Sequence, residues 1–351
     1  MRGIIVAVAA LAAGGILAVL LSACSGSLYK PGSAAKLEVR PEGNLQGPEG
    51  RLEVGNGVEL YWFAQGNAGG RPVIMVHGGP GYPFKEPWKA LDSLDDGRRF
   101  IYYHQRGSGK STRPVDRFQS KNFYKNMKEL DAKLGMATQL RDIEALRLAS
   151  GAEKISLIGH SYGGLLAALY AVEYPAHIDR LVLVAPAEVA RMPIKKSSGL
   201  YGVVREKLPG SKRADYDDFL KRFFDYGKLF DKSEGELQEL NFEFIGFFEE
   251  AFPSMRALDG CLSVEDIAGW EPQALFLSLG RQYDLSKAFI GIKVPTLIIT
   301  GSSDFTSEAE ILDTYGKIPN ATHRVLPTGH FAFEEDERDF ARVVGDFLDG
   351  K

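Results

Sequence analysis

The chain has 351 residues, of which 44% are apolar and 25% are charged, and its formal net charge is −4. This composition is close to that of an average globular protein, so a collagen-like, coiled-coil or wholly disordered chain is excluded. A mildly acidic chain without long basic runs has no electrostatic footprint for nucleic acid. The length fits one large α/β domain, or one domain that carries a substantial insertion.

The first 23 residues indicate an export signal. Arg2 precedes an apolar run that reaches Leu21, as in a secretory signal peptide. The run is also nearly long enough to cross a bilayer, so an uncleaved anchor helix is the alternative. Residues 21–24 (LSAC) favour cleavage, because they resemble the bacterial lipobox, whose cysteine is acylated and becomes the new N-terminus. We therefore expect a signal peptide over 1–23 and a lipid anchor on Cys24.

An acyl chain on Cys24 would hold the protein on the lipid bilayer. The expected location is the cell envelope, on the outer or the cytoplasmic membrane, facing the periplasm or the exterior. Cys261 would then have no disulfide partner, and we expect it to be a small buried hydrophobe. Residues 24–50 are rich in Ser, Gly and Pro and lack apolar periodicity, so they are expected to form a tether between the lipid and the folded body.

An α/β core is expected over residues 51–186 and 291–351. Short apolar runs predict strands, and 3.6-residue spacing predicts helices between them. The predicted strands are 52–54, 58–63, 73–76, 100–103, 155–158, 181–184, 296–300 and 324–326, and the clearest helices are 136–149 and 162–174. Strands that alternate with helices imply a mostly parallel central sheet flanked by helices on both faces.

The stretch 187–290 interrupts this alternation. It is rich in Phe, Tyr, Leu and charged residues and has no strand-like alternation, so it is expected to form several helices. An insertion of this kind between two strands of a sheet is most simply a helical cap over the carboxyl ends of the strands.

Residues 159–164 (GHSYGG) fit the pattern G-x-S-x-G between a predicted strand and a predicted helix. In this context the serine lies on a tight turn that directs its hydroxyl into a cleft, and the glycines let the strand and the helix pack closely around the turn. A glycine-rich turn with an inert serine is the alternative. The strand before the motif and the helix after it favour Ser161 as a nucleophile.

A serine hydroxyl needs an imidazole base, which a carboxylate in turn orients. Asp304 follows the predicted strand 296–300, and His330 follows the predicted strand 324–326. Both positions are at carboxyl ends of strands, where open α/β sheets place their sites. The sequence therefore predicts a Ser161, Asp304 and His330 triad.

The loop 77–81 (HGGPG) follows the strand 73–76. The oxyanion of a tetrahedral intermediate needs backbone N–H donors that are already in place. Tyr162, the residue after the nucleophile, supplies one donor. Gly79 is the candidate for the other, because Pro80 has no N–H.

These motifs together resemble the α/β-hydrolase fold over residues 51–349, and within it the prolyl iminopeptidase group. The loop 77–81 and residues 105–111 (QRGSGKS) are both typical of that group. The resemblance implies a serine aminopeptidase that removes an N-terminal residue, often proline, from short peptides beneath a helical cap. One departure is His104, which stands where the group usually has Asp.

In that group, glutamates in the cap bind the free amine of the substrate. These glutamates usually belong to Trp-Glu motifs or to aromatic motifs that contain Glu. The nearest match taken here is residues 247–250 (FFEE), so Glu249 and Glu250 are the candidate substrate-binding residues. This assignment follows from the resemblance alone.

Other chemistries fit less well. Residues 107–111 end like a phosphate-binding loop, but the full motif needs glycine at position 104, so no nucleotide is expected. The sequence has no His-Glu-x-x-His motif and no Cys/His cluster, so neither a metal nor another cofactor is expected. The sequence predicts a serine hydrolase, most simply an aminopeptidase acting on peptides. An esterase or lipase with the same triad is the first alternative, and a catalytically inactive binding protein of the same fold is the second.

Overall fold

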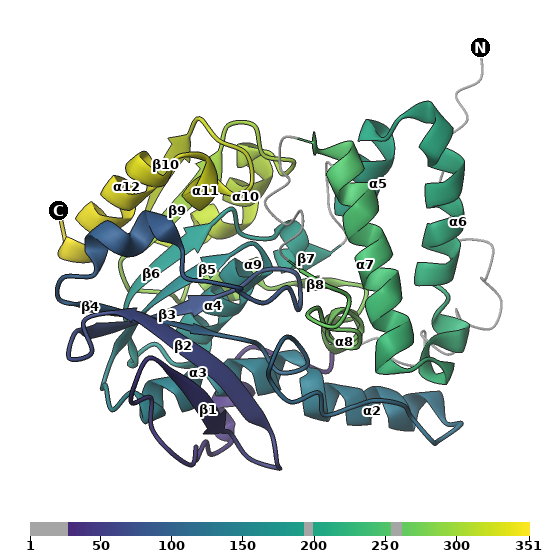
Figure 1. Ribbon diagram of the computed structural model, residues 1–351, viewed down its shortest axis with the longest axis horizontal. Coiled ribbons are helices and arrows are strands. Elements are labelled where there is room, and N and C mark those ends of the chain that lie inside the picture. Colours follow the sequence, from purple (N-terminus) through teal and green to yellow (C-terminus); the bar gives the residue numbers. More distant parts are fainter. Residues whose placement is uncertain (1–26, 193–198, 254–261) are drawn as a thin grey trace.

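The structure is a computed structural model, and residues 27–192, 199–253 and 262–351 are described from it (Figure 1). The predicted signal peptide, Cys24 and Cys261 lie outside these residues. Within them, eight strands form one sheet in the order β1-β2-β4-β3-β5-β6-β9-β10, and β7 pairs with β8 in a separate short ladder. The strands are β1 (Glu49–Glu53), β2 (Glu59–Gly66), β3 (Arg71–Val76), β4 (Arg98–Tyr103), β5 (Ile155–His160), β6 (Ile178–Val184), β7 (Arg191–Met192), β8 (Tyr283–Asp284), β9 (Thr296–Gly301) and β10 (Ala321–Leu326).

Neighbouring strands run parallel from β4 to β10, and β1 and β2 join the sheet antiparallel. Every residue of β5 and of β9 is buried, as expected of parallel strands that are covered on both faces. The carboxyl ends of β3, β5, β9 and β10 lie along one edge of the sheet. The segments that follow these strands, which hold the predicted site residues, are therefore brought together.

Helices cover both faces of the sheet. They are α2 (Phe123–Leu134), α3 (Met136–Ala149), α4 (Tyr162–Glu173), α5 (Gly199–Lys207), α6 (Arg213–Phe223), α7 (Glu234–Ala251), α8 (Glu271–Leu279), α9 (Ser286–Phe289), α10 (Glu308–Thr314), α11 (Ala332–Glu335) and α12 (Glu337–Asp349). Side chains alternate along each strand, so Ile74 packs in the same core cluster as Leu140 of α3 and Leu166 of α4. Its neighbour Met75 packs on the other face with Phe340 of α12.

The predicted strands and the two clearest predicted helices are confirmed, and α3 has the predicted bounds. The sequence analysis missed α2. Its buried side chains Met127, Leu130 and Leu134 have helical spacing, but lysine and asparagine residues interrupt the apolar pattern. The side chain of Asn122 accepts a hydrogen bond from the Lys125 amide and caps the helix N-terminus.

The insertion between β6 and β9 is more varied than the expected helical cap over 187–290. Helices α5, α6 and α7 stand to one side of the sheet (Figure 1), whereas α8 packs against α2 and α9 packs against α4. The short strands β7 and β8 pair Arg191 with Asp284 where the chain leaves the core and returns to it. The cap proper is therefore α5 to α7 with their connections, joined to the core by a two-stranded ladder that the sequence analysis did not predict.

The expected tether over 24–50 is wrong for its described part. From residue 27 onward the chain packs on the body, and Tyr29 and Ala34 are fully buried. The 3-10 helix η1 (Ala34–Lys36) contacts α3, and β1 begins at Glu49. The buried carboxylate of Glu173, at the end of α4, accepts hydrogen bonds from this segment. Such partners are distant in sequence, so local composition cannot reveal them.

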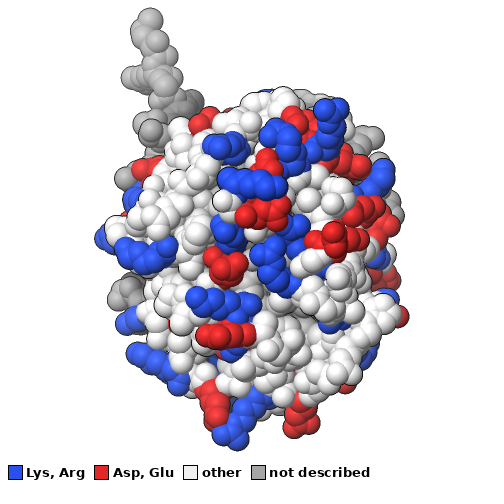
Figure 2. All heavy atoms as spheres, turned by 90° about the vertical axis from the view of Figure 1, so that its left-hand side faces the viewer, with Lys and Arg blue, Asp and Glu red and all other residues white. Residues whose placement is uncertain are grey.

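On the face that carries α12, Lys and Arg side chains are interspersed with Asp and Glu (Figure 2). Ion pairs across this region join Lys89 to Glu337 and Arg98 to Asp349. Among the residues that the structure describes, none of the helices combines the length and the apolar character that a bilayer crossing needs.

Candidate active site

Ser161 occupies the turn between β5 and α4 with φ +54° and ψ −120°, a conformation that residues other than glycine rarely adopt. The adjacent glycines make the turn possible. A Cβ on Gly159 would lie 2.2 Å from the carbonyl oxygen of Gly163, and a Cβ on Gly163 would lie 2.1 Å from that of Val76. The amide of Ser161 donates a hydrogen bond to the carbonyl of Val184 (2.9 Å), which fixes the turn to β6. The motif therefore holds the serine in a strained conformation at the edge of the sheet.

Asp304 and His330 meet at the neighbouring strand ends. Nδ1 of His330 lies 3.1 Å and 3.0 Å from the two carboxylate oxygens of Asp304, and both side chains are buried. The two loops are tied together because the amide of Ser303 donates to the carbonyl of Thr328 (2.9 Å). A carboxylate on Nδ1 fixes the imidazole orientation and leaves Nε2 as the nitrogen that can accept a proton.

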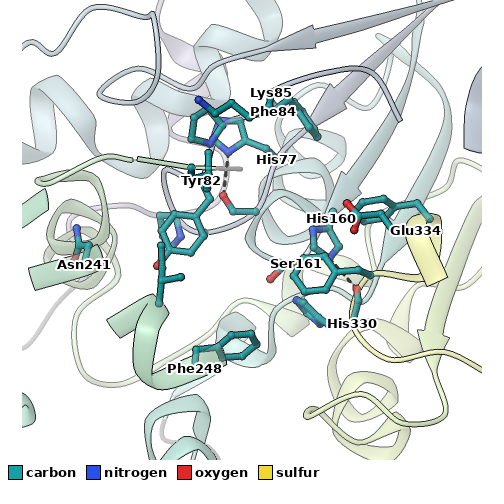
Figure 3. A pocket seen from close by; sticks show the side chains of 18 of the residues that line it. His77, Tyr82, Phe84, Lys85, His160, Ser161, Asn241, Phe248, His330 and Glu334 are labelled. Carbon is teal, nitrogen blue, oxygen red and sulfur yellow. Dashed lines mark hydrogen bonds between the residues drawn. The ribbon is translucent and has the colours of Figure 1, made fainter. Parts of the chain in front are cut away.

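Ser161 and His330 line the same cavity (Figure 3). No hydrogen bond joins the hydroxyl of Ser161 to the imidazole of His330 in this structure. Nε2 of His160 donates a hydrogen bond to the backbone carbonyl of His330 (2.9 Å). The ring centroids of Phe305 and His330 lie 4.4 Å apart. The candidate base is therefore held from both sides at the cavity wall.

The glycine-rich loop after β3 passes directly over the serine. A Cβ on Gly78 would lie 3.1 Å from Cβ of Ser161, and Gly79 has φ +115°, which favours glycine. Both glycines line the cavity. Tyr162 is the first residue of α4, so its amide is one of those that an α-helix leaves without an intrahelical partner. The two predicted oxyanion donors, Gly79 and Tyr162, thus flank the serine from the loop and from the helix.

His77 fixes the shape of this loop. The amide of Gln105 donates to Nε2 of His77 (2.9 Å), and Nδ1 lies 2.9 Å from the carbonyl oxygen of Gly78. Burial lowers the pKa of His77 to about 3, so the ring is neutral at physiological pH. Because Nε2 accepts, the proton lies on Nδ1, which donates to Gly78.

His104, which departs from the pattern of the resembling group, is a structural residue here. Its Nε2 lies 2.8 Å from the carbonyl oxygen of Phe84, and its Nδ1 accepts from the amide of Lys110 (2.9 Å). Burial lowers the pKa of His104 to about 4, so this ring is also neutral. His104 therefore ties the segment after the glycine-rich loop to β4, at the outer wall of the cavity.

The cavity has a volume of about 420 Å³, within the range of small-molecule sites. Its walls come from the core and from the cap, and most of the lining side chains are aromatic or aliphatic. Those from the cap are Leu200, Tyr201, Phe223, Asn241, Phe244, Ile245 and Phe248. Asn241 and Phe248 project from α7 across the cavity from Ser161 (Figure 3). An apolar side chain next to the scissile bond would fit this enclosure.

Three carboxylates also line the cavity, namely Glu86, Glu334 and Glu337, together with Lys85 and Lys89. Partial burial raises the pKa of Glu334 to about 7, and the negative charges of Glu335, Glu86 and Glu337 add to this effect. The cavity is thus apolar near the serine and also bordered by charged groups.

Glu249 and Glu250, the expected substrate-binding residues, do not line the cavity. Helix α7 presents the positions 241, 244, 245 and 248 to it, a spacing of three and four residues that defines one helix face. Residues 249 and 250 lie off that face by about 100° and 200° of helical rotation. Glu250 points toward Lys212 instead, with 3.9 Å between the charged atoms. The expected role of Glu249 and Glu250 in substrate binding is therefore wrong. The sequence motif does not show which face of α7 lines the cavity.

Sequence analysis missed a different carboxylate, Glu271, at the start of α8. Its side chain is completely buried, and neither carboxylate oxygen has a hydrogen-bond partner. It lies against the glycine-rich loop, because a Cβ on Gly81 would be 2.9 Å from its Oε2. Burial, followed by the negative charges of Glu234 and Asp142, raises the pKa of Glu271 well above its usual range.

Glu234, at the start of α7, completes a buried acidic pair with Glu271. The amides of Gly269 (2.8 Å) and Trp270 (2.9 Å) donate to the Glu234 carboxylate, and Arg113 lies 3.4 Å away. Burial raises the pKa of Glu234 to about 7 despite these partners. The dipeptide Trp270-Glu271 was the available sequence signal, because Trp-Glu motifs hold amine-binding glutamates in the group that the chain resembles.

Comparison with known proteins identifies the family. A family model described as the alpha/beta hydrolase fold matches residues 71–337. The chain belongs to the α/β-hydrolase family. A proline iminopeptidase of Lactobacillus helveticus is 27% identical over 312 residues, which cover 84% of this chain and 95% of that protein. A proline iminopeptidase of Clostridium botulinum is 28% identical over 294 residues, which cover 79% of this chain and 89% of that one.

Solved structures agree on the fold. A hydrolase of Pseudomonas aeruginosa has a TM-score of 0.57 at 20% identity and covers 87% of this chain and 99% of its own. The proline iminopeptidase of Mycobacterium smegmatis has a TM-score of 0.52 at 20% identity and covers 84% of this chain and 96% of its own. This α/β-hydrolase thus shares its fold with enzymes of differing names. Among its described residues, no group of three or more His, Cys, Asp or Glu side chains is arranged to hold a metal ion.

Proposed function

We propose that the protein is a serine hydrolase that acts through an acyl-enzyme, and that it is an aminopeptidase of the proline iminopeptidase type. The observation that carries the chemistry is the alignment of groups at one sheet edge. Ser161 lies on a strained turn and lines the same cavity as His330. Nδ1 of His330 donates a hydrogen bond to the carboxylate of Asp304. Similarity to proline iminopeptidases over most of the chain supports the choice of substrate class.

In the proposed reaction, Oγ of Ser161 bonds to the substrate carbonyl carbon while Nε2 of His330 takes the hydroxyl proton. Asp304 orients the imidazole and stabilises its positive charge. The amides of Gly79 and Tyr162 donate to the oxyanion. When the intermediate collapses, the C–N bond breaks and His330 gives its proton to the leaving amine. Water, deprotonated by His330, then attacks the acyl-enzyme and releases the acid and Ser161.

The buried pair Glu234 and Glu271 is proposed to hold the α-ammonium group of the substrate. A buried carboxyl group without a hydrogen-bond partner is costly, and a cationic group beside it would favour its ionised form. The pair lies beside Gly81, whose neighbours Pro80 and Tyr82 line the cavity. A substrate whose acyl carbon reaches Ser161 would then have its amine directed toward the base of the cap.

A substrate panel tests this proposal. Purified protein is offered prolyl and other aminoacyl arylamides, their N-blocked counterparts and short-chain p-nitrophenyl esters. The expected result is hydrolysis of the free-amine substrates with strong loss on N-blocking. If esters are cleaved far faster and N-blocking has no effect, the enzyme is an esterase. If none of the panel is cleaved, the alternative of an inactive binding protein replaces the hydrolase proposal.

We also propose that Cys24 is lipid-acylated after removal of residues 1–23, which places the enzyme on a membrane of the cell envelope. The support is the sequence alone, because these residues lie outside the described ones. The variant Cys24→Ser should release the protein from the membrane fraction. Membrane association that persists in this variant would favour an uncleaved helix instead.

A further inference from the structure

The N-terminal segment 27–37, here called the strap, is fixed to the body at two sites. At the end of α8, Oγ of Ser27 donates to the carbonyl of Leu279 (2.6 Å), and the amide of Tyr29 donates to that of Ser278 (3.0 Å). At the end of α4, the strap donates three hydrogen bonds to the buried carboxylate of Glu173. The donors are the Tyr29 hydroxyl (2.8 Å) and the amides of Gly32 (2.7 Å) and Ala35 (3.0 Å).

This attachment begins three residues after Cys24 in the sequence. Only residues 25 and 26 separate that cysteine from Ser27. Three Cα-to-Cα steps span at most about 10 Å. We propose that the strap and the adjoining end of α8 form the surface that faces an anionic lipid bilayer, so that the enzyme is held in one orientation. This inference rests on the proposed acylation of Cys24.

The charge of this surface fits anionic headgroups. Lys30 and Lys36 of the strap are exposed, and Arg281 is exposed two residues after Leu279. The nearby acidic residue Glu38 is paired with Arg40. Leu37, at the end of the strap, is 51% exposed, although it is a large apolar side chain. Basic residues beside an accessible apolar one suit a bilayer interface, where the charges meet phosphates and the apolar group enters the boundary.

The orientation has a consequence for substrate access. Helix α8 contacts the strap at Leu279, and at its other end Pro272 lines the catalytic cavity. The nine-residue helix is about 13 Å long. The length of α8 therefore separates the strap from the cavity, and the exposed charged residues Lys85, Glu86 and Lys89 are among those that line the cavity. Substrates would arrive from the aqueous phase rather than from the membrane.

The test uses the mature protein, extracted from membranes and reconstituted into anionic vesicles with a nitroxide on the lipid headgroup. A fluorophore is attached through Lys36→Cys or, as the matched control, through Arg338→Cys, both in a Cys261→Ser background. Arg338 is exposed on α12, which covers the opposite face of the sheet. We expect quenching at position 36 to be at least threefold stronger than at position 338. A 20-residue Gly/Ser insertion between Gly26 and Ser27 should remove that difference without releasing the protein.

Equal quenching at the two positions, or a difference that survives the insertion, would overturn the proposed orientation. Failure of the unlabelled protein to sediment with the vesicles would overturn it together with the acylation at Cys24. Arylamide hydrolysis is measured on the same samples. Hydrolysis depends on Ser161 and not on the strap, so this measurement tests the hydrolase proposal independently of the orientation.

Discussion

The core end of the site and its cap end are built in different ways. At the core end, Ser161, Asp304 and His330 each follow a strand, and glycines or short hydrogen bonds fix their backbones. At the cap end, the cavity wall consists of helix faces, and the buried acidic pair lies behind that wall beside Gly81. The positions of both depend on how helices pack. The comparison suggests that the core supplies the chemistry and the cap supplies the specificity. Variants at the core end should therefore lower kcat on all substrates, and variants at the cap end should change which substrates are preferred.

The largest expected effect is that of Ser161→Ala. Loss of the nucleophile should reduce kcat by about 10⁴-fold or more on every substrate, with little change in unfolding temperature. Steady-state kinetics on arylamides and esters and a thermal melt are the measurements. The exposed Ser93→Ala is the matched control and should behave as wild type. Near-normal turnover in Ser161→Ala would remove this residue from the mechanism.

Asp304→Asn should come next. It keeps the shape of the side chain but removes the charge and changes which imidazole tautomer is favoured, so kcat should fall by about 10³- to 10⁴-fold. The loss should be of similar size for amide and ester substrates, because the imidazole serves both. A loss confined to KM would instead assign Asp304 to substrate binding.

On the cap side, Glu271→Gln should lower kcat/KM for free-amine substrates by about 10²-fold, since it removes one charge-assisted hydrogen bond from a buried site. Hydrolysis of esters that lack an amine should change by less than about threefold. Glu250→Gln is the matched control and should leave both activities unchanged, because Glu250 points toward Lys212, whereas Glu271 lies beside Gly81 of the glycine-rich loop. Equal losses on amine and ester substrates would make Glu271 a structural residue.

The pH dependence of kcat/KM should also distinguish the acidic pair at the cap end from the triad at the core end. The raised pKa of Glu234, about 7 in the free protein, means that its carboxylate is ionised above that pH and protonated below it. An ammonium group needs the ionised form, so kcat/KM for amine substrates should fall relative to that for esters as the pH drops. Between about pH 7.5 and about pH 6 the ratio should decrease about eightfold. Taking the ratio cancels the pH effects that the two reactions share. A ratio that is flat across this range would contradict the role of the pair.

The last prediction concerns the strap and the stability of the fold. Glu173→Gln should lower the free energy of unfolding by about 2 kcal/mol, because a buried carboxylate that accepts three hydrogen bonds is replaced by an amide that can satisfy fewer. Denaturant unfolding of the purified enzyme measures this, with the exposed Glu153→Gln as control. Unchanged stability would mean that the strap contributes little to the fold.

The sequence predicted the structure correctly where the conformation depends on residues that are close together in the sequence. The G-x-S-x-G turn around Ser161 needs its glycines within two residues, and the strand ends that hold Asp304 and His330 follow from short apolar runs. The same reasoning failed for Glu249 and Glu250, because composition does not give the rotational phase of α7 against the core. It also failed for the strap, since Tyr29 and Glu173 are 144 positions apart.

The most direct test of the central claim is to identify the residue that a fluorophosphonate modifies. The intact protein is treated with the probe, digested and analysed by mass spectrometry, with Ser161→Ala treated in parallel. We expect one adduct per chain, on Ser161, and none on the variant. Equal labelling of the variant, or no labelling of the wild-type protein, would contradict it.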